Sequence, residues 1–345
     1  MEHLKIICIG GGTGLHTTLT GLRGRFPNAQ LGAVVSMMDS GGSTGRLRDE
    51  FGYLPPGDMR RALIALSDAP LELRALMQHR FKAEGSGLHD HVVGNIILTA
   101  LKDLSGGDEY AAIEAMSRIL NLRGMAYPVT LTNCHLVAKL EDGSVIRGET
   151  NIDIPKHNPN LRITALGLEP RAVIFEKTAA AIESADIIII GPGDLYTSLM
   201  PNLIVEGMVS ALKQAKRNGA RIILVTNTMT KHGETNKFRA SDFLSIIQDA
   251  LDGAFIDAVI MNTARPPSGL LAAYAAEGAE PVLPDLAHSG DGPIIIGADV
   301  ISTEAFARHN STLLAKAIEE VIMALGDWRG MNSSITDTES ITMEK

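Results

Sequence analysis

Short runs of apolar residues recur along the chain, and each is followed by small or polar residues. These runs cover residues 4–9, 31–38, 185–190, 221–226, 258–262 and 293–296. Apolar runs of this length, without polar alternation, are typical of parallel strands that are covered on both faces. The pattern therefore predicts a mostly parallel sheet.

Segments with apolar residues at helical spacing separate these runs. They cover residues 14–22, 60–67, 71–81, 92–101, 109–120, 241–251 and 311–325, and a further helix follows residue 194 and ends at about residue 216. Strands that alternate with helices are typical of α/β folds with a doubly wound sheet. We therefore expect a Rossmann-like fold.

The middle of the chain departs from this alternation. Residues 129–140 and 145–149 flank a short turn that contains Gly143, which predicts a β-hairpin inserted into the fold. The sequence has no internal repeat and no low-complexity linker, so we expect a single domain over residues 1–328. Residues 329–345 are polar and are predicted to form a flexible tail.

Composition narrows the classes of function. The 345 residues carry a formal net charge of −9, and nucleic acid is not an expected partner because its phosphates are bound by clustered Lys and Arg. No apolar run reaches the roughly 18 residues of a membrane span, and no signal peptide is evident. The two cysteines, Cys8 and Cys134, form no zinc or redox motif. We expect a cytoplasmic protein.

The first glycine-rich loop follows the first predicted strand and opens a helix. It contains Gly11, Gly12, Thr13 and Gly14. Glycines at a helix N-terminus let backbone N–H groups approach an anion, so the loop indicates a phosphate site. The loop is a poor nicotinamide fingerprint because Leu15 stands where the third glycine belongs, which disfavours a dehydrogenase.

A second loop of the same kind runs from Asp39 to Arg46. Its candidate ligand-binding residues are Asp39, Gly41, Gly42, Ser43 and Thr44, and it is not a Walker loop because no GK[ST] triplet occurs. Three roles are open for Asp39: it binds a ribose hydroxyl, it binds Mg²⁺, or it caps the turn.

Polar residues follow the later strands as well. Gly191, Gly193 and Asp194 come after one strand, and Thr226 with Asn227 comes after the next. Because ligands of doubly wound sheets bind at the carboxyl ends of the strands, these residues outline one site. Asn262 follows a third strand.

Three further features lie near these loops. Asp58 is a candidate N-cap of the helix that follows it, which is a structural role, whereas Arg60 and Arg61 either reach a phosphate or lie on the surface. His89 and His91 lack a nearby third ligand, so a role at the helix start or in hydrogen bonding to a ligand is favoured over a metal site. No nucleophile motif is present.

Several motifs together resemble the YvcK family of gluconeogenesis factors, which shares the fold of CofD, a 2-phospho-L-lactate transferase. The motifs are IGGGTGL, DSGGSTGRLR, LPPGDMR, LEDGSVIRGE, GPGDLYTSLMPNL and TNTMTKHGET. The resemblance covers nearly the whole chain and implies a CofD-like fold and a regulatory role in cell shape, cell-wall precursor supply and gluconeogenic growth.

The resemblance also implies a ligand and site residues. It implies binding of UDP-sugars, notably UDP-N-acetylglucosamine, with Arg308 as the diphosphate contact and Asn95 as a retained motif residue. Ser311 stands where some members have a phosphorylated threonine. A protein partner in cell-wall precursor synthesis is implied, and phosphorylation of Ser311 and homo-oligomerisation are left open. The alternative is a CofD-like phospholactyl transferase, in which Asp39 or Asp194 would bind Mg²⁺.

Overall fold

The computed structural model describes residues 4–253, 255–288, 290, 292–302 and 306–326. Its centre is a parallel sheet in the order β10-β9-β8-β7-β1-β2-β3. The strands are β1 (Lys5–Gly10), β2 (Gln30–Val35), β3 (Met125–Pro128), β7 (Ile187–Ile190), β8 (Arg221–Val225), β9 (Ala258–Asn262) and β10 (Ile294–Ala298). The chain reverses its direction of winding between β1 and β7, as in a Rossmann fold, so the predicted fold class is confirmed.

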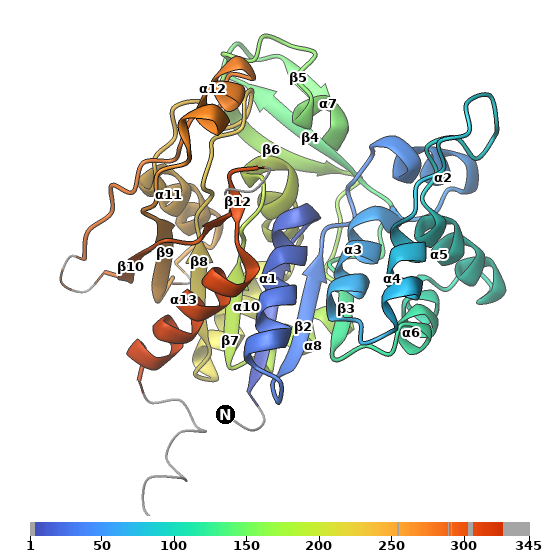
Figure 1. The fold of residues 1–345 in the computed structure, drawn as a ribbon, viewed down its shortest axis with the longest axis horizontal. Helices are drawn as coiled ribbons and strands as arrows, with labels where there is room; N and C mark the ends of the chain where they lie inside the picture. The colour runs from blue at the N-terminus through green and yellow to red at the C-terminus, as the bar shows by residue number, and fades with distance from the viewer. Residues whose placement is uncertain (1–3, 254, 289, 291, 303–305, 327–345) are drawn as a thin grey trace, which may run out of the picture.

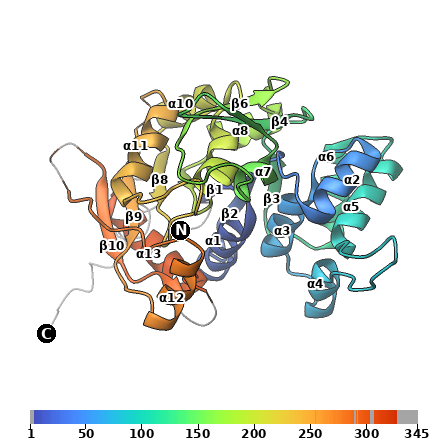
Figure 2. The ribbon, with the colours of Figure 1, turned by 90° about the horizontal axis from the view of Figure 1, so that it is seen from above.

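Helices cover both faces of this sheet, as Figure 2 shows. One face carries α1 (Gly12–Arg25), α3 (Pro56–Leu66) and α13 (Ser311–Ala324), and the other carries α8 (Glu176–Glu183), α10 (Met208–Arg217) and α11 (Ala240–Ala250). In α10 the buried residues Met208, Ala211, Leu212 and Ala215 recur at helical spacing. With both sheet faces covered, all four residues of β7 are buried, which explains its uninterrupted run of isoleucines.

Helices also extend the molecule beyond the β3 edge of the sheet (Figure 1). They are α2 (Gly42–Phe51), α4 (Leu71–Gln78), α5 (Val93–Leu104) and α6 (Glu109–Ile119). The second glycine-rich loop is helical from Gly42 onward, where it forms the first turns of α2. The sequence analysis did not predict this helix. Since β2 ends at Val35, Asp39 lies beyond the strand rather than at its end.

The inserted hairpin is confirmed, and a third strand joins it. The strands β4 (His135–Leu140), β5 (Val145–Arg147) and β6 (Ile163–Glu169) form a small antiparallel sheet in the order β5-β4-β6. The predicted first arm at 129–140 was too long at its start, because β4 begins at His135 and residues 129–134 form no strand. The short helix α7 (Glu149–Asp153) follows β5 and brings the insertion to the carboxyl edge of the main sheet.

The remaining elements surround that edge. They are a π-helix (Leu195–Leu199), α9 (Met200–Leu203), α12 (Ser268–Ala276), β11 (Ile301–Ser302) and β12 (Arg308–His309). Both cysteines are free and buried. Among the described residues, no helix combines the length and apolar character that crossing a bilayer requires. The predicted tail at 329–345 lies outside the described residues.

Candidate functional site

The first and third glycine-rich loops meet at the point where the sheet changes its direction of winding. A Cβ atom on Gly14 would lie 2.2 Å from the carbonyl oxygen of Pro192, so only glycine permits this contact between the loops. Gly12 has φ +61°, which also favours glycine. These two positions place the N-terminus of α1, with its partial positive charge, beside the third loop.

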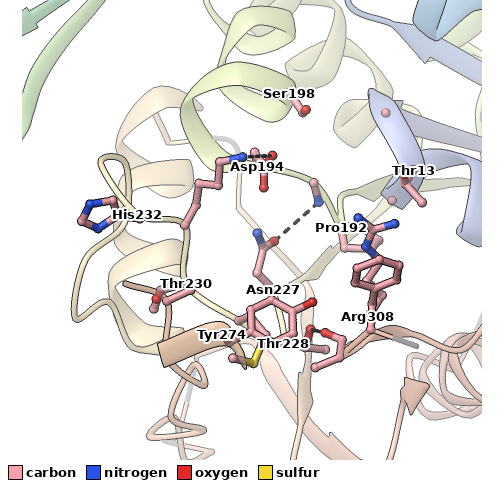
Figure 3. A pocket seen from close by; sticks show the side chains of 18 of the residues that line it. Thr13, Pro192, Asp194, Ser198, Asn227, Thr228, Thr230, His232, Tyr274 and Arg308 are labelled. Atoms are coloured by element: carbon pink, nitrogen blue, oxygen red, sulfur yellow. Dashed lines mark hydrogen bonds and ion pairs between the residues drawn. The ribbon is translucent and has the colours of Figure 1, made fainter. Parts of the chain in front are cut away.

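A cavity of about 560 Å³ opens at this junction. Figure 3 shows side chains from several elements around it, with Thr13 from the first loop, Asp194 from the third, Asn227 after β8 and Arg308 on β12. The predicted site residues that line it are Gly11, Gly12, Thr13, Gly14, Gly193, Asp194, Asn227 and Arg308. Its lining also includes Asp153, Lys231, Tyr274 and His309, which the sequence analysis did not single out as ligand contacts.

An ammonium group lies among the carboxylates on the acidic side of the cavity. The Lys231 Nζ lies 2.9 Å from an Asp153 oxygen and 3.7 Å from an Asp194 oxygen. Burial lowers the pKa of Lys231, but Asp194 and Asp153 outweigh that effect and hold it above its ordinary value. Burial holds the pKa of Asp194 above its ordinary value, although Lys231 lowers it. Lys231 thus supplies a positive charge beside Asp194, and the binding of Mg²⁺ by Asp194 stays a prediction of the alternative function.

The buried Glu234 completes this acidic cluster. It accepts hydrogen bonds from the Tyr196 backbone N–H at 3.1 Å and the Thr197 hydroxyl at 3.0 Å. Burial, then the charge of Asp194, raises its pKa well above the ordinary value. Carboxylate oxygens of Asp153, Asp194 and Glu234 lie within 4.8 Å of one another, close enough to share a cation. Lys231 forms ion pairs with Asp153 and Asp194, the two members of this cluster that line the cavity.

The opposite wall is the β12 strand, which holds a cation and a neutral imidazole. The Arg308 guanidinium lies 4.5 Å from the centre of the Phe306 ring and forms no ion pair with a described residue. Burial lowers the pKa of His309 to about 4, although a hydrogen bond to the Thr226 backbone raises it. The buried His309 Nε2 has no partner among the described residues. An anion with hydroxyl groups would satisfy both side chains.

The second loop forms a separate polar cluster whose residues do not line the cavity. Asn95 donates to Ser43 and Thr44, and the Arg60 Nε donates to Asn95 at 2.8 Å. Asp39 accepts from the Gly41 N–H at 2.9 Å, which matches the turn-capping reading. Arg60 is therefore a buried structural cation rather than a surface charge.

Three carboxylates lie between this cluster and the first loop. A Cβ on Gly11 would lie 2.5 Å from an Asp58 oxygen, and a Cβ on Gly57 would lie 2.6 Å from an Asp39 oxygen. Burial, and then Asp39, raises the pKa of Asp58 to about 6 and that of Glu149 to about 8. The Arg61 guanidinium lies 2.9 Å from an Asp58 oxygen and forms an ion pair with it. Asp58 is not the predicted helix cap, because Pro55 precedes the helix and Asp58 lies in its first turn.

The remaining candidates have structural contacts. The Thr226 hydroxyl donates to the Ile260 carbonyl, and Asn262 closes a turn with Ala264. Gly191 has φ +86° and precedes the cavity-lining part of its loop. His91 Nδ1 lies 3.2 Å from the Ser43 hydroxyl, which is a contact within the protein, so the hydrogen bond to a ligand stays a prediction.

These features define a class: a Rossmann-like protein with a polar cavity at the switch point of its sheet. The model of the CofD family, described as 2-phospho-L-lactate transferase CofD, matches residues 6–301. A gluconeogenesis factor from Halalkalibacterium halodurans is 38% identical over 325 residues, or 93% of this chain and 97% of that protein. The gluconeogenesis factor of Bacillus subtilis is 38% identical over 279 residues, or 81% of this chain and 84% of that protein.

Structural comparison agrees with these sequence matches. A crystal structure of a UPF0052 family member from Bacillus halodurans has a TM-score of 0.84 and 36% identity, and the match covers 92% of this chain and 100% of that chain. The chain therefore belongs to the CofD family, and its relatives are the gluconeogenesis factors. The resemblance inferred from the motifs is confirmed.

Proposed function

We propose that this chain is a cytoplasmic regulator that binds a UDP-sugar, UDP-N-acetylglucosamine, in the cavity at the switch point. The observation that carries the proposal is the convergence of the α1 N-terminus, Lys231 and Arg308 on one cavity. A diphosphate needs donors of this kind from more than one side. The volume of about 560 Å³ lies within the range of small-molecule sites.

In this proposal each end of the ligand has its own contacts. The diphosphate lies between Thr13 and Arg308, and an aromatic side chain, Tyr274, offers a face for the uracil ring. The buried Nε2 of His309 accepts a hydrogen bond from a ligand hydroxyl. The choice of uridine among the nucleotides comes from the family resemblance, as does the proposed role in cell shape, cell-wall precursor supply and gluconeogenic growth through a protein partner.

Calorimetric titration with UDP-N-acetylglucosamine tests the proposal. We expect saturable binding that Arg308→Ala weakens by about tenfold to a hundredfold, because a charge-assisted contact contributes about 1.5–3 kcal/mol. Arg118→Ala, an exposed arginine on α6, is the matched control and should bind as the unmodified protein does. ADP-glucose and GDP-mannose should bind more weakly. Absence of binding by every UDP-sugar rejects the proposal.

The carboxylates beside the first loop favour a second candidate, a CofD-like transferase that moves a phospholactyl group from a nucleotide-activated donor to a deazaflavin. Asp58 and Glu149 are oxygen donors of the kind that Mg²⁺ prefers, and burial, followed by the charge of Asp39, raises the pKa of both carboxyls. When bound there, Mg²⁺ would neutralise negative charge on a phosphate. The chain's own contribution would be to orient the donor with Arg308 and the first loop.

Product assays separate the two candidates. The folded protein is incubated with the activated donor, a deazaflavin acceptor and Mg²⁺, and the coupled product is sought by mass spectrometry. Asp58→Asn is the matched variant, and it should lose both product and any stabilisation by Mg²⁺ in thermal unfolding. If the protein binds nucleotide but forms no coupled product, the transferase candidate is rejected.

A further inference from the structure

A second cavity, of about 790 Å³, lies beside α12. Its apolar wall includes Phe238, Pro266, Leu271 and Val282, and Pro266 and Val282 are buried. Its volume falls within the range of small-molecule sites. Neither the motifs of the sequence nor the function proposed above assigns it a ligand.

Three cations surround this apolar wall. Lys237, Arg239 and Arg265 line the cavity against a single acid, Glu280. None of the three takes part in an ion pair between described residues, although many other Lys and Arg side chains do. In a chain of net charge −9, an unpaired cationic group around an apolar cavity favours an anionic ligand with an apolar body.

The helix α12 separates the two cavities. Leu270, Ala273 and Tyr274 line the first cavity, while Leu271 and Ala275 line the second. The helix is made almost entirely of Leu, Ala and Tyr, yet no residue of it is buried. An apolar helix without buried residues is unusual, because such helices normally lie in a core. Figure 1 shows it at the outer edge of the fold, above the ends of β8 and β9.

The connections at both ends of α12 also contribute to the two sites. The residue Ala279, just after the helix, lines both cavities, and Arg265, just before it, lines the second. A ligand that fixes α12 from one side therefore changes the wall of the cavity on the other side. Such coupling is reciprocal for binding free energies.

We propose that the second cavity is an effector site for a small organic anion with an apolar body and one acidic group, and that α12 couples its occupancy to the first cavity. The apolar body packs against Phe238 and Leu271, and the acidic group contacts Arg265 and Lys237. The coupling, but not the site itself, rests on the proposed binding of UDP-N-acetylglucosamine.

Fluorescence titration with anilinonaphthalene sulfonate tests the site, because this probe joins an apolar aromatic body to one anionic group. We expect saturable binding to the folded protein that the double variant Lys237→Glu, Arg265→Glu weakens by about tenfold. Ala275→Trp fills the cavity from an exposed position and should weaken binding without a change of charge. Arg118→Glu, on the distant α6, should leave the titration unchanged.

The uncharged relative phenylnaphthylamine tests the chemical class. It should bind at least about fivefold more weakly than the sulfonate and should not respond to the double charge reversal. Equal binding of both probes, equal binding by the charge-reversed variant, or no saturable binding overturns the site. Circular dichroism confirms that each variant is folded.

Calorimetry then tests the coupling. Saturating sulfonate probe should change the Kd for UDP-N-acetylglucosamine by at least about threefold, and Ala275→Trp should abolish that change. An unchanged Kd overturns the coupling and leaves the site. If no UDP-sugar binds at all, the proposed function fails while the probe titrations still decide the second site.

Discussion

Replacement of Glu149 by Gln should make the protein more resistant to heat at alkaline pH and should have little effect at acidic pH. Burial and the neighbouring Asp39 raise the pKa of Glu149 from 4.5 to about 8. The folded state therefore holds a proton that the unfolded chain releases. Stability falls as the pH rises from about 4.5 to about 8, because the folded state binds more protons than the unfolded state in that window.

The size of the effect follows from this difference in pKa. At about 1.4 kcal/mol per pH unit, the upper bound is about 5 kcal/mol, and relaxation around a partly exposed carboxyl reduces it to about half. A chain of this length unfolds with an entropy of about 0.7 kcal/mol/K, so we expect a rise in Tm of about 3–7 °C. The Ser40 N–H donates a hydrogen bond to a Glu149 oxygen at 3.2 Å. Gln at this position keeps an oxygen that accepts the same hydrogen bond.

Thermal unfolding followed by circular dichroism at pH 5, 7 and 9, with EDTA present, measures this difference. Glu141→Gln, at the exposed hairpin turn, serves as the control for loss of one negative charge. The reasoning is refuted if Glu149→Gln lowers the Tm at pH 9, or if its effect is the same at all three pH values.

Two further substitutions test the cavity walls. Gly14→Ala places a Cβ 2.2 Å from the Pro192 carbonyl oxygen and should destabilise the protein by about 1–3 kcal/mol in thermal unfolding. The control is Gly24→Ala in the same helix, where the added Cβ meets nothing within 4 Å and should stabilise the protein slightly. Lys231→Met leaves two carboxylates without their cation, so it should cost about 3 kcal/mol and weaken UDP-sugar binding in calorimetry. If Gly14→Ala or Lys231→Met leaves the stability unchanged, that result contradicts the contact on which its prediction rests.

The sheet was predictable because the apolar sequence of each strand follows from the burial of that strand. β7 and β8 are covered on both faces, and their short length and many β-branched residues favour strands over buried helices. By contrast, β6 is largely half-exposed or exposed, and α12 is short and uniformly apolar with no buried face. Neither segment carries a periodic signal, because its environment comes from packing that the local sequence does not encode.

The site was predictable only in part for the same reason. Glycines at strand ends pointed to the first and third loops, since backbone approach to an anion requires them. Glu149 contacts Ser40 across more than a hundred residues of sequence, and Lys231 meets Asp153 from another element. Single residues of these types have no distinctive spacing, although Lys231 and Asp58 lie within motifs that the sequence analysis quoted.

A crystal structure of the protein soaked with UDP-N-acetylglucosamine tests the central claim most directly. We expect density for the diphosphate between the Gly11–Gly14 loop and Arg308, with Lys231 on its other side. Density for the ligand at the Asp39–Thr44 cluster instead, or an empty cavity at saturating ligand, would contradict it.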